Sequence, residues 1–206
     1  MSPAYQRFLD FFQLTGTQRM QGPDGFVFDA MTPDERRQAW DFLWARVAAG
    51  GTGESVDLLF WADEVRAALE VPALIAAGRL RPQAEVVAAW NVYQSLRDPA
   101  MLSCFVRALA DANPEVRGEA ACRAPAGAPT RALLHGLREM VLHETDRLAY
   151  VHARNKLLQC HGVTEEALGR KAGLRIRRAL ASDDISERAA MLARLERDHP
   201  VAVIDG

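Results

Sequence analysis

The amino-acid sequence predicts an all-α protein made of stacked antiparallel helical hairpins, about nine to eleven helices in all. Capping residues followed by proline recur along the chain, as in Ser2-Pro3 and in Thr32-Pro33-Asp34-Glu35, where the glutamate completes a capping box. The segments that follow these caps have helical apolar spacing and short connectors. By contrast, the best alternating run, 25–28, is too short to pair alone as a strand.

The helices of the first half are bounded by caps, glycines and prolines. Ser2-Pro3 begins a helix that ends before Thr15-Gly16, and Thr32 caps a second helix that ends at Gly50-Gly51. Between them lies a loop over 15–31 that is rich in glycine and threonine. Apolar periodicity predicts further helices over 55–69, 72–77 and 82–96.

The helices of the second half are bounded by the same kinds of residue. Asp98-Pro99 and Asn113-Pro114 begin two consecutive helices, and the proline-rich segment 125–129 ends the second. The remaining helices are expected over 130–143, 146–161, 164–181 with Gly173 as a candidate break, and 186–198.

Composition excludes several classes of protein. The chain has 206 residues with 49% hydrophobic and 25% charged residues, which is typical of a globular fold with an ample core. Lys and Arg total 25 against 27 for Asp and Glu, and the net charge of −2 argues against a protein that coats phosphate backbones. A nucleic-acid partner is therefore not expected.

The cysteines and the amino terminus favour a cytoplasmic protein. Cys104, Cys122 and Cys160 form an odd set, which argues against a disulfide framework and favours a reducing compartment. Arg7 and Asp10 interrupt the apolar start, so no export signal is predicted, and the apolar runs are far too short to span a membrane.

Two segments repeat with an offset of 35 residues, one beginning at Asp111 and the other at Asp146. Each has Asp, four residues, Val and then a basic or polar residue, at the turn into a second helix, which is the period of helical-repeat units. The stretch 102–124 resembles a HEAT repeat through Asp111, Val116, Arg117, Ala120 and Ala121.

The HEAT resemblance covers about 98–161, within a single predicted domain over 1–206. It implies N-terminal helices over 1–97, HEAT-like hairpins over 98–161 and capping helices over 162–206. The second unit departs from the family pattern at His152, Asn155 and Lys156, so looser stacking is expected there.

One polar stripe of the 146–161 helix predicts a contact surface. When the repeats are aligned through Val116 and Val151, Glu115 falls beside Tyr150 and Glu119 beside Arg154. Arg117 and His152 are expected to tie neighbouring units together. The predicted partner-binding residues, called the contact row below, are Glu115, Glu119, Arg147, Tyr150 and Arg154.

No catalytic constellation is evident in the sequence. His143-Glu144 lacks the second histidine of a zinc-protease motif because position 147 is arginine. His143, His152 and His161 are nine residues apart, so successive rings point in opposite directions on a helix. Hydrolase elbows, phosphate-binding glycine loops and dinucleotide fingerprints do not occur. We expect no catalytic residues, metal or cofactor, and no enzyme.

Two other features have open interpretations. Arg170, Lys171, Arg175, Arg177 and Arg178 form the densest basic cluster, which is either a solvated helix face or a site for an acidic protein, favoured over nucleic acid. Phe26, Phe28 and Met31 either make exposed apolar contacts or cap the core.

These features predict a non-catalytic protein-protein interaction module. The resemblance to short, stand-alone, HEAT-like bacterial proteins implies a cytosolic inhibitor or immunity protein that binds and blocks a cognate toxin or effector. One alternative is an adaptor or chaperone that loads an effector. Another is a HEAT-like alkylpurine DNA glycosylase, in which Trp90 and Tyr93 or Tyr150 would converge with the arginines of 131–178.

Overall fold

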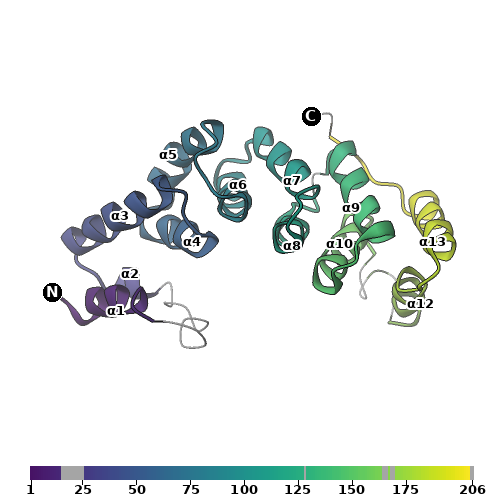
Figure 1. Ribbon diagram of the computed structural model, residues 1–206, viewed down its shortest axis with the longest axis horizontal. Coiled ribbons are helices and arrows are strands. Elements are labelled where there is room, and N and C mark those ends of the chain that lie inside the picture. Colours follow the sequence, from purple (N-terminus) through teal and green to yellow (C-terminus); the bar gives the residue numbers. More distant parts are fainter. Residues whose placement is uncertain (15–25, 128, 164–166, 168–169, 205–206) are drawn as a thin grey trace. The chain divides into compact units, whose positions relative to one another are not determined.

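The computed structural model describes residues 1–14, 26–127, 129–163, 167 and 170–204 (Figure 1). The chain divides into two compact units, Met1–Arg97 and Asp98–Gly206, and buried apolar side chains fill each of them. This division falls where the sequence places the junction between the N-terminal helices and the HEAT-like hairpins. The single domain over 1–206 stays a prediction.

The all-α class is confirmed. Apart from an isolated bridge between Thr130 and Ile204, the described residues form helices and irregular segments, without a β-strand. None of the described helices is both long enough and apolar enough to cross a lipid bilayer. The first unit contains α1 (Pro3–Phe11), α2 (Phe26–Asp29), α3 (Pro33–Ala48), α4 (Gly53–Ala62), α5 (Glu64–Ala76) and α6 (Pro82–Leu96). The second contains η2 (Pro99–Met101), α7 (Leu102–Ala108), α8 (Pro114–Arg123), α9 (Arg131–His143), α10 (Arg147–Cys160), α12 (Arg170–Leu180) and α13 (Ile185–Asp198).

The predicted capping box at Thr32 is present and also anchors α1. The hydroxyl of Thr32 accepts a hydrogen bond from the main-chain nitrogen of Glu35, and the Glu35 carboxylate accepts one from the main-chain nitrogen of Thr32 at 3.1 Å. The same carboxylate also accepts a hydrogen bond from the main-chain nitrogen of Ser2, the residue that caps α1. These hydrogen bonds, from Ser2 first and Thr32 second, lower the pKa of Glu35 to about 2.

One helix boundary in the first unit differs from the prediction. The expected break before Pro72 is absent, since α5 continues through Pro72, and the chain instead breaks at Asp63. Asp63 is extended, and its carboxylate accepts a hydrogen bond from the main-chain nitrogen of Arg66 at 3.1 Å, which caps α5. Packing of α5 against α4 and α6 outweighs the penalty of about 3 kcal/mol for an internal proline.

The predicted 15–31 loop contains a short helix, α2, and its residues 15–25 lie outside the described part of the chain. Phe28 and Met31 are buried, with exposed fractions of 1% and 8%, so the expectation that they make exposed contacts is wrong. Phe28 packs edge-on against Phe8 of α1, with ring centroids 5.7 Å apart. These two residues therefore close one part of the core.

In the second unit, α8 lies along α10 and α7 contacts α9, so the hairpins α7–α8 and α9–α10 are neighbours. A Cβ at Gly118 of α8 would lie 3.4 Å from the Cα of Ala149 in α10, which shows how closely these helices approach. The small residues at this crossing allow that approach.

Arg117 joins the turns of the two hairpins. Its Nη1 donates to the carbonyls of Asp111 and Ala112 in the first turn, at 2.8 and 3.0 Å. Its Nε and Nη2 donate to the carboxylate of Glu144 in the second turn, at 2.6 and 2.7 Å. This bidentate pair is the main cause of the lowered pKa of Glu144, and it gives Arg117 the linking position that the sequence predicts.

The last two helices pack against the hairpins and against each other. The candidate break at Gly173 is absent, since α12 continues through it to Leu180. On α13, Leu192 and Leu195 are buried, and Nη1 of Arg188 donates to the carbonyl of Val141 near the end of α9 at 3.0 Å. This hydrogen bond satisfies a carbonyl that the helix end leaves without an intrahelical partner.

Candidate binding groove in the second unit

The contact row lies on α8 and α10, and its members differ in exposure. Glu115 and Arg147 are exposed, whereas Glu119 is half-buried and forms an ion pair with Arg123 on its own helix. Among the described residues, no ion pair joins Glu119 to Arg154, so the cross-helix charge pairing expected from the repeat alignment is absent there. The row therefore offers a partner fewer charged groups than its sequence suggests.

Tyr150 and Arg154 are engaged within the unit. The hydroxyl of Tyr150 donates to the main-chain carbonyl of Leu180, the last residue of α12, and the phenol is half-buried. The guanidinium of Arg154 lies 5.6 Å from the centroid of the Tyr150 ring. Tyr150 thus supports the end of α12, Arg154 lies against its ring, and contact of either residue with a partner stays a prediction.

Three members of the predicted basic cluster share one exposed face of α12. Lys171, Arg175 and Arg178 are spaced by four and three residues, which places them one above another on a helix. We call these three residues the basic row. None of them has a hydrogen bond or ion pair within the described parts of the chain, whereas the side chain of Arg177 interacts with another group. The side chain of Arg170 lies outside the described residues.

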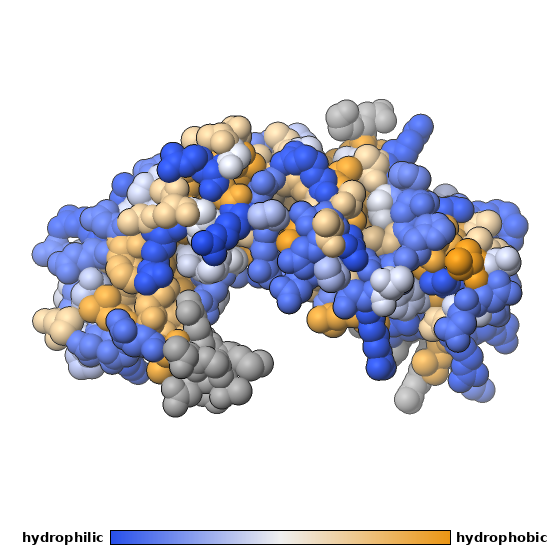
Figure 2. All heavy atoms as spheres, viewed as in Figure 1, coloured by the Kyte–Doolittle hydropathy of each residue, from blue (hydrophilic) through white to orange (hydrophobic). Residues whose placement is uncertain are grey.

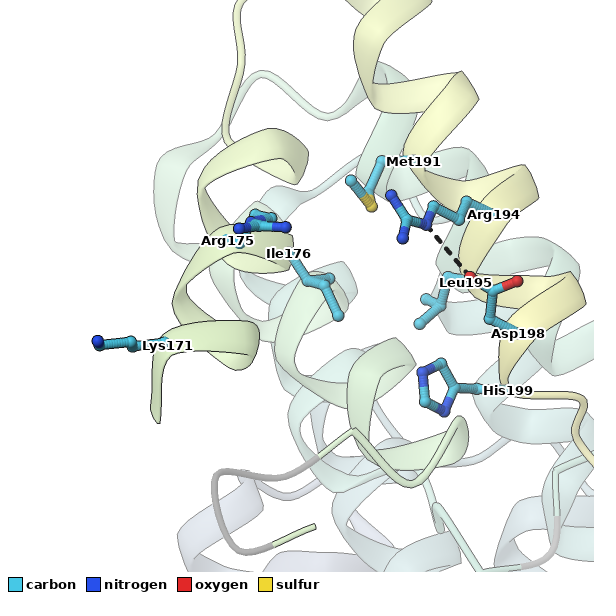
Figure 3. A pocket seen from close by; sticks show the side chains of 8 residues that line it. All are labelled: Lys171, Arg175, Ile176, Met191, Arg194, Leu195, Asp198 and His199. Atoms are coloured by element: carbon cyan, nitrogen blue, oxygen red, sulfur yellow. Dashed lines mark hydrogen bonds and ion pairs between the residues drawn. The ribbon is translucent and has the colours of Figure 1, made fainter. Parts of the chain in front are cut away.

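A groove runs between α12 and α13, next to the basic row (Figure 3). Its volume is about 380 Å³. Ile176 of α12 and Leu195 of α13 point toward each other across it, and Met191 lies beside them. The complete lining, drawn in Figure 3, is Lys171, Arg175, Ile176, Met191, Arg194, Leu195, Asp198 and His199.

The charges around this groove are mostly positive. Asp198 is its one carboxylate among the described lining residues, and it accepts hydrogen bonds from Nε of Arg194 at 3.2 Å and Nε of Arg197 at 3.1 Å. The Arg194 hydrogen bond is the largest cause of the lowered pKa of Asp198. Because Asp198 is paired in this way, Lys171 and Arg175 are left with an excess of positive charge.

A second hollow, of about 810 Å³, lies at the turn between α12 and α13, next to the basic row. It shares Lys171 and Arg175 with the groove and adds Arg178 and the half-exposed Leu174. In Figure 2, hydrophilic side chains predominate over this end of the second unit, with a small apolar spot at α13. The basic row therefore borders two hollows that both combine cations with apolar groups, and the second also contains the carboxylates of Asp183 and Glu187.

The groove is held by contacts on both of its helices. Leu180 is fully buried at the end of α12 and receives the Tyr150 hydrogen bond. At the far end of α13, Nδ1 of His161 lies 2.6 Å from the carbonyl oxygen of His199, which ties the chain after α13 to the end of α10. Arg138 of α9 also pairs with Glu196. These contacts fix the distance between the two walls.

The sequence indicated only one wall of this groove. The basic cluster of α12 stands out in the sequence, but Met191 and Arg194 do not, because nothing local shows that α13 packs beside α12. Their spacing with Leu195 on one side of a helix was the available signal.

The other titratable groups among the described residues contribute to packing more clearly than to a metal site or a catalytic reaction. Within the described residues, no three His, Cys, Asp or Glu side chains are placed to hold a metal ion. Burial is the main cause that raises the pKa of Cys160 to about 11, so its thiol is a weak nucleophile at neutral pH. All three cysteines are free, and Cys104 is buried.

The first unit has an exposed apolar strip that the sequence did not indicate. Trp61, Val65 and Leu69 have exposed fractions of 51%, 73% and 69%, and they follow one another across the break at Asp63. Grouped apolar residues of this kind mark a second candidate contact surface.

No protein-family model matches the chain, and neither the curated proteins nor the solved structures include a match to it.

Proposed function

We propose that the chain is a non-catalytic protein-binding module and that the α12–α13 groove binds an acidic segment of its partner. The observation that carries this proposal is the basic row: Lys171, Arg175 and Arg178 are exposed on one face, without partners in the described parts of the chain. Most exposed charges on protein surfaces lie among charges of both signs. A row of one sign attracts and orients a ligand of the opposite sign.

An acidic protein is favoured over nucleic acid by the size and composition of this surface. The row contains three cations, and the whole chain has a net charge of −2, which repels a long polyanion outside the groove. The described lining of the groove contains no aromatic side chain except the imidazole of His199, so it offers little surface on which bases stack. These facts weigh against the glycosylase alternative.

The arrangement of α7–α10 supports the HEAT-like part of the proposal. Neighbouring hairpins pack α8 on α10 and α7 on α9, and Arg117 links their turns. Hairpins stacked in this way present rows of side chains on a continuous surface. The stacked, solenoid-like arrangement is therefore our proposal for the second unit.

The biological role we propose is that of a cytosolic inhibitor or immunity protein that covers a cognate toxin or effector. This role follows from the resemblance to short HEAT-like proteins that act alone. Its test is coexpression of the partner captured from the native host, with the chain present or absent. Relief of toxicity supports inhibition, whereas delivery of an active effector indicates an adaptor and contradicts inhibition.

The acid-binding proposal has a direct test. A fluorescein-labelled ten-glutamate peptide is titrated with the full chain, and fluorescence anisotropy reports binding. Replacing the basic row by glutamate (Lys171→Glu, Arg175→Glu, Arg178→Glu) removes three attractions of about 0.7 kcal/mol each, so affinity falls roughly 30-fold. Absence of binding by the unmodified chain, or tighter binding of a DNA duplex than of the peptide, contradicts the proposal.

Two control variants make this test specific. Replacing the exposed residues Arg7, Arg81 and Arg131 by glutamate changes the net charge by the same amount without changing the lining of the groove. This control is expected to keep the affinity within about twofold, since none of the three residues lines the groove and salt screens exposed charges that do not contact the ligand. Arg147→Glu tests the contact row instead. A larger loss of affinity for the peptide in this variant than in the basic-row variant would indicate that the binding site lies on α10.

A further inference from the structure

We infer that the α12–α13 groove selects, within an acidic segment, one large apolar side chain that is flanked by carboxylates on both sides. This inference rests on the proposed function and adds what the basic row alone does not specify. The evidence is the combination of an apolar floor with cations on both walls of one groove.

The floor of the groove is apolar and faces open space. Ile176 and Met191 are half-buried, and Leu195 below them has an exposed fraction of 2%. In Figure 3 the side chains of Ile176 and Leu195 point into the same space from opposite helices. Transfer of an apolar side chain into this space removes it from water and covers the floor at the same time.

The volume suits one large side chain. The groove measures about 380 Å³, which corresponds to roughly a dozen water molecules at about 30 Å³ each. A tryptophan or phenylalanine ring fits into such a space and buries a large area with few rotatable bonds. Met191 is unbranched and flexible, so it adapts to anchors of different shape.

The cations on the two walls require carboxylates on both sides of the anchor. Arg175 belongs to α12 and Arg194 to α13, and they lie on opposite sides of the apolar floor. The ion pair of Arg194 with Asp198 uses Nε, and its Nη atoms have no hydrogen-bond partner among the described residues. These terminal nitrogens remain able to donate to a ligand carboxylate.

The geometry of an extended peptide matches this arrangement. Residues two positions apart in an extended chain point to the same face, about 6 to 7 Å apart. An acid, spacer, anchor, spacer, acid pattern therefore directs the anchor into the groove and both carboxylates toward its walls. A partner segment of this pattern is the ligand that the groove fits.

The test compares three labelled peptides on the full chain by fluorescence anisotropy. They contain the patterns Glu-Ser-Trp-Ser-Glu, Glu-Ser-Ala-Ser-Glu and Lys-Ser-Trp-Ser-Lys. We expect the first to bind about tenfold more tightly than the second, because the buried ring adds apolar contact. The third is expected not to bind, because its charges are repelled by both walls.

Each outcome of this comparison has one meaning. Equal affinity for the tryptophan and alanine peptides overturns the inference that the groove binds an apolar anchor. It leaves the proposed binding of acidic segments intact. Binding of the ten-glutamate peptide but of neither short acidic peptide also overturns the anchor. Binding of the lysine peptide as tightly as of the glutamate peptide, or failure of every acidic peptide to bind, overturns the proposed function and the anchor with it.

Two variants locate the anchor site. Met191→Ala enlarges the groove and is expected to reduce the tryptophan-to-alanine affinity ratio at least threefold, without altering binding of the ten-glutamate peptide. Leu174→Ala is the matched control, because Leu174 lies on α12 between Lys171 and Arg175 but lines the other hollow and not the groove. A ratio that falls in Leu174→Ala and not in Met191→Ala places the anchor outside the groove and overturns the inference.

Discussion

The phenolic hydroxyl of Tyr150 donates a hydrogen bond to the main-chain carbonyl of Leu180, so the first turn of α10 is joined directly to the last residue of α12. Tyr150 belongs to the contact row, and α12 carries the basic row. A substitution at Tyr150 is therefore expected to affect α12 even where no partner touches the tyrosine. Binding losses from changes in α10 must be separated from loosening of α12.

Tyr150→Phe removes this hydrogen bond and retains the ring. We expect a loss of about 1 kcal/mol in the free energy of unfolding, because the carbonyl of Leu180 loses its side-chain donor. Amide hydrogen exchange should become faster in α12 and remain unchanged in α7. Tyr5→Phe in the first unit is the control. Equal exchange rates in α12 of the variant and the unmodified chain would contradict a supporting role for Tyr150.

The pair of Arg117 and Glu144 predicts a pH-dependent stability. Glu144 has a side-chain exposed fraction of 3%, and its pKa is lowered from 4.5 chiefly by the hydrogen bonds from Arg117. Because the folded-state pKa lies below the unfolded value, this stabilisation is complete above about pH 4.5 and is lost as the pH falls through the folded-state pKa. Glu144→Gln should cost about 2 kcal/mol at pH 7 and progressively less in acid.

Urea unfolding at pH 7, 4 and 3 measures this dependence. Far-UV circular dichroism reports the helices of both units, and tryptophan fluorescence reports the first alone, because all four tryptophans lie there; the second unit is followed by the difference between the two. Glu139→Gln makes the same charge change at an exposed site on α9 and should have little effect. A cost for Glu144→Gln that stays constant from pH 7 to 3 would show that the charge of Glu144 does not stabilise the fold.

Most helices were predictable because their signals are local. Caps and prolines define the starts of α1, α3, α8 and α9 within one or two residues of the structure. The break at Asp63 was not predictable in this way, because Pro72 is the stronger local signal. Only the packing of α5 against α4 and α6 shows that the proline is tolerated.

The candidate site was half predictable for the same reason. The basic cluster is local in sequence, so Lys171, Arg175 and Arg178 were identifiable before the fold was known. The opposite wall lies on another helix, and its position depends on tertiary contacts such as that of Arg188 with Val141. The exposure of side chains was predicted less well. Tyr150 lies on the helix face expected to contact a partner, but its hydroxyl donates a hydrogen bond to the carbonyl of Leu180 in α12.

Two glycines should respond in opposite ways to alanine. A Cβ at Gly53 would lie 2.9 Å from Cγ2 of Val87, a stiff branched side chain, so Gly53→Ala should cost about 1 to 2 kcal/mol. A Cβ at Gly136 would lie 2.9 Å from Cδ1 of Leu109, the end of a flexible side chain. There the gain in helix propensity of about 1 kcal/mol is expected to offset the contact.

Thermal unfolding of the two variants checks this contrast, with tryptophan fluorescence for Gly53→Ala and circular dichroism for Gly136→Ala. A lower melting temperature is expected for the first and an equal or higher one for the second. If both variants lose the same stability, the flexibility of the opposing side chain does not decide the outcome.

Salt should separate the two components of groove binding. The cations of the basic row are exposed, and the Debye length falls from about 10 Å at 0.1 M salt to about 3 Å at 1 M. Affinity for the glutamate peptides should therefore fall several-fold over this range, mainly through slower association, which stopped-flow fluorescence measures. Burial of the tryptophan anchor does not depend on charge screening, so the tryptophan-to-alanine affinity ratio should stay constant or rise. A ratio that collapses with salt, alongside the overall affinity, would mean that the ring acts through the cations and not through the apolar floor.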